Sequence, residues 1–139
     1  MKKDIRGQDV YYSINWSRLF EYDKHEARRV LPELPGIIHI QNRINKRIVT
    51  SLFYACWRDG LRVGLAKLMD DLVLQHNDLR EKLLEHDMFY QYCVIDTKPL
   101  DIQDIMFFLI KEHKPLLNDS EGFSDSKRYM NIFVKEIED

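Results

Sequence analysis

Two neighbouring segments rich in β-branched and aromatic residues constrain the fold of this chain most strongly. Residues 36–40 and 47–57 both have the composition of β-strands. Asn45 and Lys46, which lie between them, are typical turn residues. The two segments therefore predict an antiparallel β-hairpin, and the fold class depends on the elements that come after this hairpin.

Helical and strand-like segments alternate after the hairpin. Apolar residues recur at helical spacing over 61–73, a second helix is expected over 78–84, and residues 88–96 predict a third strand. Residues 99–115 predict a helix that begins at one proline and stops at another, and 129–137 predict a short closing strand. This order predicts an α/β (α+β) fold: a small mixed sheet that contains the hairpin and is flanked by helices.

The residues before the hairpin are charged and rich in aromatic side chains. We expect residues 1–31 to be an N-terminal extension packed on a single domain formed by 32–139, with a helix that starts after Asn15 and runs to Ala27. The aromatic residues of the extension are either core side chains or a protein-binding surface, because Trp and Tyr are favoured anchors at interfaces. The candidates for that surface are Tyr11, Tyr12, Trp16 and Phe20.

The charge balance argues against a strongly basic nucleic-acid binder. The 139 residues include 21 Lys and Arg and 23 Asp and Glu, for a net charge of -2. Neutralising phosphates requires cations, so any contact with nucleic acid needs a local basic patch. The candidates are Arg43, Lys46, Arg47, Lys111, Lys114 and Arg128, whose alternative role is that of solvated charges at turns and helix ends.

No sequence feature indicates a cofactor, a metal site or a membrane segment. Cys56 and Cys93 lie in apolar, strand-like runs, which predicts buried, reduced thiols, and the Cys and His spacing does not match a zinc site. We find no signal peptide and no apolar run of about 18–20 residues. These observations predict a soluble, cytoplasmic protein.

Two separated motifs resemble the ends of a known nuclease domain. Leu31-Pro32-Glu33-Leu34-Pro35-Gly36-Ile37-Ile38 is similar to the Pro-Gly-Val/Ile-Tyr opening of GIY-YIG nucleases. The helix ending Leu109-Ile110-Lys111-Glu112-His113-Lys114-Pro115, with Asn118 after it, resembles the end of the N-terminal domain of the bacterial excision-repair nuclease. The resemblance covers roughly residues 32–137 and implies a GIY-YIG-like fold.

The resemblance also implies a catalytic site from which most functional groups are missing. Such a nuclease uses two tyrosines, an arginine, a metal-binding glutamate and an asparagine. The matching positions hold Ile38 for the first tyrosine, Tyr54 or Val49 for the second, Gly64 for the arginine, Met106 for the glutamate, and Asn118. Arg62 and Asp104, close to two of these positions, are expected to point elsewhere on their helices.

The favoured hypothesis is a catalytically inactive GIY-YIG-like domain that acts as a binding or structural subunit, mainly through protein contacts. One alternative is a nucleic-acid-binding module that keeps phosphate contacts. A second is a divergent endonuclease that uses Tyr54, Arg62 and Asn118 with Mg²⁺. His39 and His113 are candidates for a substitute active site, although histidines beside apolar strands are more often structural.

Overall fold

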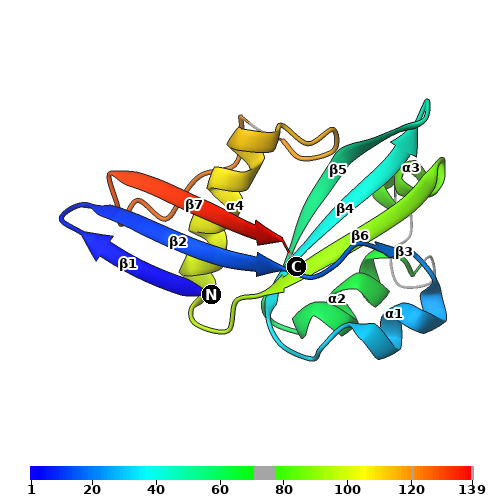
Figure 1. Ribbon diagram of the computed structural model, residues 1–139, viewed down its shortest axis with the longest axis horizontal. Coiled ribbons are helices and arrows are strands. Elements are labelled where there is room, and N and C mark those ends of the chain that lie inside the picture. Colours follow the sequence, from blue (N-terminus) through cyan, green and yellow to red (C-terminus); the bar gives the residue numbers. More distant parts are fainter. Residues whose placement is uncertain (71–77, 120, 139) are drawn as a thin grey trace.

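The chain forms two β-sheets side by side, with helices packed against them (Figure 1). The structure, a computed structural model, describes residues 1–70, 78–119 and 121–138. In chain order the elements are β1 (Lys2–Arg6), β2 (Asp9–Trp16), β3 (Phe20–Glu21), α1 (Lys24–Val30), β4 (Gly36–Ile44), β5 (Arg47–Cys56), α2 (Gly60–Leu68), α3 (Asp78–Leu84), β6 (Asp87–Val94), α4 (Pro99–His113) and β7 (Asn131–Glu138).

Sheet B contains the predicted hairpin. Its strand order is β3-β6-β4-β5, and each neighbouring pair is antiparallel. Asn45 and Lys46 connect β4 to β5 with φ angles of 51° and 67°, the left-handed backbone of a tight hairpin turn. The hairpin, its turn and the neighbouring third strand are therefore confirmed.

The helices expected after the hairpin are present. α2 and α3 occupy the two predicted helical regions, although residues 71–77, in which we expected the first helix to end, lie outside the described part of the chain. α4 begins at Pro99 and ends at His113, and Lys114 adopts a left-handed conformation with a φ angle of 48°. The proline that comes next cannot continue the helix.

The helix expected between Asn15 and Ala27 is wrong. Tyr12, Ile14 and Trp16 belong to β2, and their side chains alternate with exposed ones, which is a strand pattern. Only Lys24–Val30 is helical, capped by the Asp23 carboxylate, which accepts hydrogen bonds from the backbone of His25 and Glu26. Pairing with distant strands outweighs the local helical spacing of Trp16, Leu19 and Phe20.

Sheet A joins the two ends of the chain. Its order is β1-β2-β7; β1 pairs with β2 in antiparallel fashion, whereas β2 and β7 run parallel from Asp9 and Asn131 to Trp16 and Glu138. The predicted closing strand is thus confirmed as β7, and it lies beside the first residues of the chain rather than beside the hairpin.

Two hydrophobic clusters occupy opposite sides of sheet B. One contains Ile38 and Ile40 of β4 with side chains of α1 and α2, and the other contains Ile37 of β4 with the apolar side of α4. The inner face of sheet A packs against α4 in the second cluster. The result is an α+β fold, and no helix among the described residues is long and apolar enough to cross a membrane.

Candidate functional site

Three of the positions suggested by the resemblance lie together. Ile38 and Tyr54 are direct partners across β4 and β5, and both pack in the cluster covered by α1 and α2. Gly64 of α2 lies against Tyr54 and Cys56: a Cβ added there would overlap the Cys56 sulfur and lie 3.1 Å from its Cβ. This region is filled by packing and leaves no space for an arginine.

Met106 lies apart from these three residues. It is buried in the other cluster, beside α4, with only 4% of its surface exposed. Its side chain lines an open groove of about 450 Å³ together with Ala55, Trp57, Ile102 and Phe123. An apolar thioether at this place cannot hold a hard divalent cation, which prefers oxygen ligands.

Asn118 supports the edge of β5. Its side-chain N–H donates to the Phe53 carbonyl at 3.0 Å, and its carbonyl oxygen accepts from the Phe53 backbone N–H at 2.8 Å. Both polar groups of the amide are thereby used in a contact that imitates strand pairing.

Arg62 is tied to the connector before β4. Its Nε donates to the Leu31 carbonyl at 2.8 Å, and its Nη1 lies 3.1 Å from the Glu33 carboxylate. The arginine points to this connector rather than to Tyr54, as its position on α2 predicts.

His39 and His113 lie close together, with ring centroids 6.1 Å apart. Burial lowers the pKa of His39 to about 4, and its ring nitrogens are hydrogen-bonded to Gln91 and Thr50. His113 Nε2 lies 2.7 Å from the carboxylate of Glu136. His39 is therefore a neutral core residue, and the pair contains one solvent-accessible imidazole rather than two.

The candidate phosphate-binding cations divide into two groups. Lys46, Arg47, Lys111 and Lys114 are exposed and form no ion pair within the described residues. Arg43 pairs with Asp87 at 3.4 Å across β4 and β6. Arg128, in contrast, serves the interior of the protein.

Arg128 completes a buried charge network that the sequence analysis missed. Its Nη2 lies 3.1 Å from Asp101 and 2.8 Å from Asp104, two α4 carboxylates that are almost fully buried. Lys3 and the Tyr12 hydroxyl also donate to Asp101, at 2.9 Å and 2.8 Å. Burial opposes ionisation of Asp101, but these hydrogen bonds outweigh it and hold its pKa well below the usual range. The signal was two aspartates three residues apart within an apolar helix.

Most of the proposed partner-binding aromatic residues are core residues. Tyr12, Trp16 and Phe20 are buried, and the Trp16 Nε1 donates to Glu136 at 2.8 Å. Their assignment to a partner-facing surface is therefore wrong, because the period-two alternation of β2 turns Tyr12 and Trp16 inward. Tyr11 alone of the four points outward, with 38% of its surface exposed.

Tyr11 belongs to an exposed aromatic stack. The ring of Phe133 lies 4.9 Å from that of Tyr11 at an interplanar angle of 17°, and the Arg6 guanidinium lies 5.1 Å from the Tyr11 ring centroid. Phe133 and Ile137 are 43% and 41% exposed. The alternation of residues within β7 is the signal that would have placed these two side chains on one face.

We call this surface the outer face of sheet A. It consists of the side chains that point away from α4 on all three strands, which cross-strand pairing and burial identify as Lys2, Asp4, Arg6, Tyr11, Ser13, Asn15, Phe133, Lys135 and Ile137. α4 covers only the opposite side of the sheet (Figure 1). Three uncovered strands thus present aromatic, aliphatic and cationic groups to the solvent.

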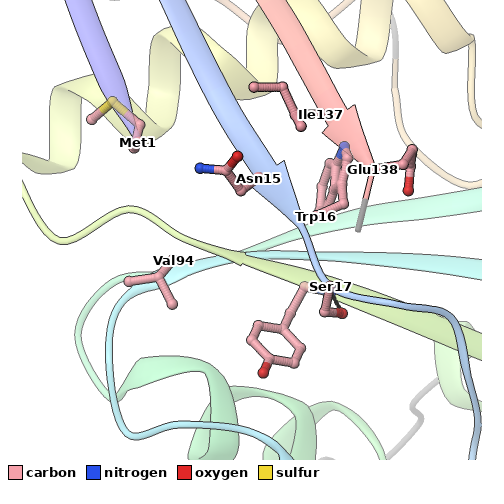
Figure 2. Close-up of a pocket in the computed structure, with 8 residues that line it drawn as sticks. Met1, Asn15, Trp16, Ser17, Val94, Ile137 and Glu138 are labelled. Atoms are coloured by element: carbon pink, nitrogen blue, oxygen red, sulfur yellow. Dashed lines mark hydrogen bonds between the residues drawn. The ribbon is translucent and has the colours of Figure 1, made fainter.

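A cleft of about 490 Å³ borders this face where the two sheets meet (Figure 2). Asn15 and Ile137 line it from sheet A, and Tyr92 and Val94 line it from β6. The backbone is fixed here because Ser17 donates its N–H to the Tyr92 carbonyl at 2.8 Å. The cleft therefore continues the outer face at its end nearest sheet B.

The described residues suit binding better than catalysis. Cys56 and Cys93 are buried and unpaired, as predicted, and burial raises the pKa of both thiols to about 12, so neither is a ready nucleophile. Within the described parts of the chain no cluster of three His, Cys, Asp or Glu residues could hold a metal ion. The exposed chemistry is concentrated on the outer face.

Comparison with known proteins gives one match. No curated protein and no solved structure matches the chain. A family model with the description "Uncharacterised protein" matches residues 1–139, so the chain belongs to that family.

Proposed function

We propose that this protein is a binding subunit without catalytic activity, and that it contacts a protein partner through the outer face of sheet A. Residues 32–139 would be a degenerate GIY-YIG-like scaffold, and the two unpaired thiols fit a cytoplasmic location. The single observation that carries the binding role is the exposed stack of Tyr11 and Phe133 on strands that no helix covers.

Packing at the former catalytic positions supports the absence of activity. Ile38 is fully buried, Gly64 is in contact with Cys56, and Met106 is buried beside α4. An ionised arginine or glutamate at such positions would be costly without its phosphate or metal partner. Apolar and small residues instead stabilise the domain.

The outer face has the composition of a protein-binding surface. Aromatic residues and arginine are enriched among residues that dominate binding energy. The Tyr11 ring is held between Arg6 and Phe133, so little side-chain entropy remains to be lost on binding. The buried aromatic residues of β2 keep the strand in place beneath this surface.

The test is recovery of the partner from the native source, followed by affinity measurement with the purified partner. We expect Tyr11→Ser combined with Phe133→Ser to weaken binding at least about tenfold, because both rings are exposed anchors. Trp57→Ser is the matched control, since Trp57 is 37% exposed and lies in the groove beside Met106. Loss of binding in the control alone would move the partner site to that groove and contradict the proposal.

The second candidate function is a nucleic-acid-binding module. It is favoured by Lys46 and Arg47 at the β4–β5 turn, which are exposed and form no ion pair among the described residues. Binding through them must weaken with salt, because each neutralised phosphate releases counterions. An electrophoretic shift at low salt that Lys46→Ala with Arg47→Ala abolishes would favour this function; no shift would exclude it.

A further inference from the structure

The edges of the two sheets are treated differently in this molecule. Residues after α4 cover the free edge of β5: the N–H groups of Leu116 and Leu117 donate to the Thr50 and Ser51 carbonyls at 3.3 Å and 2.8 Å. Asn118 continues the contact at the next position along the strand. Such cover prevents another chain from pairing with the strand.

The edge of β7 has no such cover. β7 is the last strand of sheet A, and it pairs only with β2. Within the described part of the chain, no backbone group of Asn131–Glu138 bonds to a segment on the other side. The strand is eight residues long and contains no proline, so every second residue offers an N–H and a carbonyl to a neighbour.

We propose that β7 accepts an extended segment of a partner protein as an additional strand of sheet A. This proposal rests on the proposed function and specifies how the partner binds. Main-chain hydrogen bonds to β7 supply affinity, and side chains beside the outer face supply specificity.

The outward side chains of β7 define the pattern of the partner segment. Phe133, Lys135 and Ile137 point outward in that order, and Lys135 has no ion-pair partner within the described residues. A segment that alternates apolar, acidic and apolar residues on this side would pack on Phe133 and Ile137 and neutralise Lys135. Ile137 also lines the cleft of about 490 Å³, which leaves room for a bulky side chain at that end (Figure 2).

A second copy of the chain fits this edge poorly. Antiparallel pairing of two β7 strands with Phe133 opposite Ile137 places Lys135 opposite Lys135 of the other copy, where like charges repel. Shifting the two-fold axis by one residue places Phe133 opposite Lys135, or Glu136 opposite Glu136. Charge complementarity therefore favours a different protein.

The test uses the full chain and a blocked probe peptide of sequence STVTETVTS. In either strand direction its valines lie opposite Phe133 and Ile137 when its glutamate lies opposite Lys135. We expect backbone amide NMR signals of residues 131–138 to shift, and we expect this peptide to bind about fivefold tighter than STVTKTVTS. Lys135→Glu should reverse the preference, and N-methylation of the peptide along one edge should abolish binding. No shift in β7, an unreversed preference or undiminished binding of the N-methylated peptide would each overturn the proposal.

The same measurements separate this proposal from the proposed function. Peptide addition to β7 with full retention of the native partner by the Tyr11→Ser and Phe133→Ser variant would leave the strand edge functional and refute the role of the aromatic surface. Loss of the native partner in that variant, without any peptide binding at β7, would keep the surface and refute strand addition.

Discussion

Asn118 pairs with the backbone of Phe53 as though it were a neighbouring strand. Its amide makes two hydrogen bonds, of 2.8 Å and 3.0 Å, to the N–H and carbonyl of that one residue. The side chain that the resemblance marks as a catalytic remnant thus has both of its polar groups committed to a structural contact. Its role in this chain is to close the edge of β5.

Asn118→Ala should lower the free energy of unfolding by about 2 kcal/mol, since each partly buried hydrogen bond contributes about 1 kcal/mol. Denaturant titration measures the change, and faster hydrogen exchange of the Phe53 amide would locate it. Asn131→Ala is the matched control, because Asn131 makes one exposed hydrogen bond to Asp9 and should cost less than about 0.5 kcal/mol. Equal losses in the two variants would contradict the structural role.

The elements of sheet B are predictable because their signals are local. A turn at Asn45 and Lys46, strand composition on each side of it and helical spacing over α4 all agree with the observed structure. β1 and β2 are different. Their pairing with β7 spans almost the whole sequence, and the local helical spacing around Trp16 conceals the alternation that a distant partner stabilises.

The candidate site was predictable only in part for the same reason. Tyr11 is identifiable because aromatic residues are abundant in the extension, but the three core aromatic residues beside it cannot be distinguished without knowing the sheet. Phe133 becomes a neighbour of Tyr11 only through the β2–β7 register. The buried pairing of Arg128 with Asp101 likewise depends on contacts between separate elements.

Gly64→Ala should destabilise the protein although alanine favours helices. The added methyl group would overlap the Cys56 sulfur, and overpacking costs about 1–3 kcal/mol, against a helix-propensity gain of about 1 kcal/mol. Combining it with Cys56→Ala should recover part of the loss, because the sulfur is removed. Denaturation of the two single variants and the double variant measures this coupling, and strict additivity would show that the two residues do not compete for space.

Acidification should destabilise the protein through His39. Burial lowers the pKa of this imidazole from 6.5 to about 4, so between these values the unfolded chain binds a proton that the native chain does not. Stability from this residue is complete above pH 6.5 and decreases as the pH falls towards 4, with a loss of about 2 kcal/mol at about pH 5. His39→Gln should flatten the pH dependence of denaturation in this window, whereas His25→Gln, at an exposed site, should leave it unchanged.

Arg128→Met should be among the most destabilising single changes on the surface of this protein. It leaves the buried carboxylates of Asp101 and Asp104 with Lys3 as their remaining cation, and an unpaired buried charge costs about 3–5 kcal/mol. Lys127→Met is the neighbouring control, because its ammonium is largely exposed and pairs only with Asp125. A thermal unfolding midpoint that falls equally in both variants would show that the network contributes little.

The purified chain should not cut DNA. With Mg²⁺ and supercoiled plasmid, we expect no nicking above that of a buffer control, because Met106 supplies no metal ligand, Ile38 supplies no hydroxyl and Asn118 is occupied by Phe53. Tyr54→Phe and Asn118→Ala are the informative variants, since both residues are retained at positions suggested by the resemblance. Contaminating nuclease would nick equally in all preparations. Nicking that requires Mg²⁺ and disappears in both variants would establish a divergent endonuclease and overturn the assignment of this protein as a binding subunit.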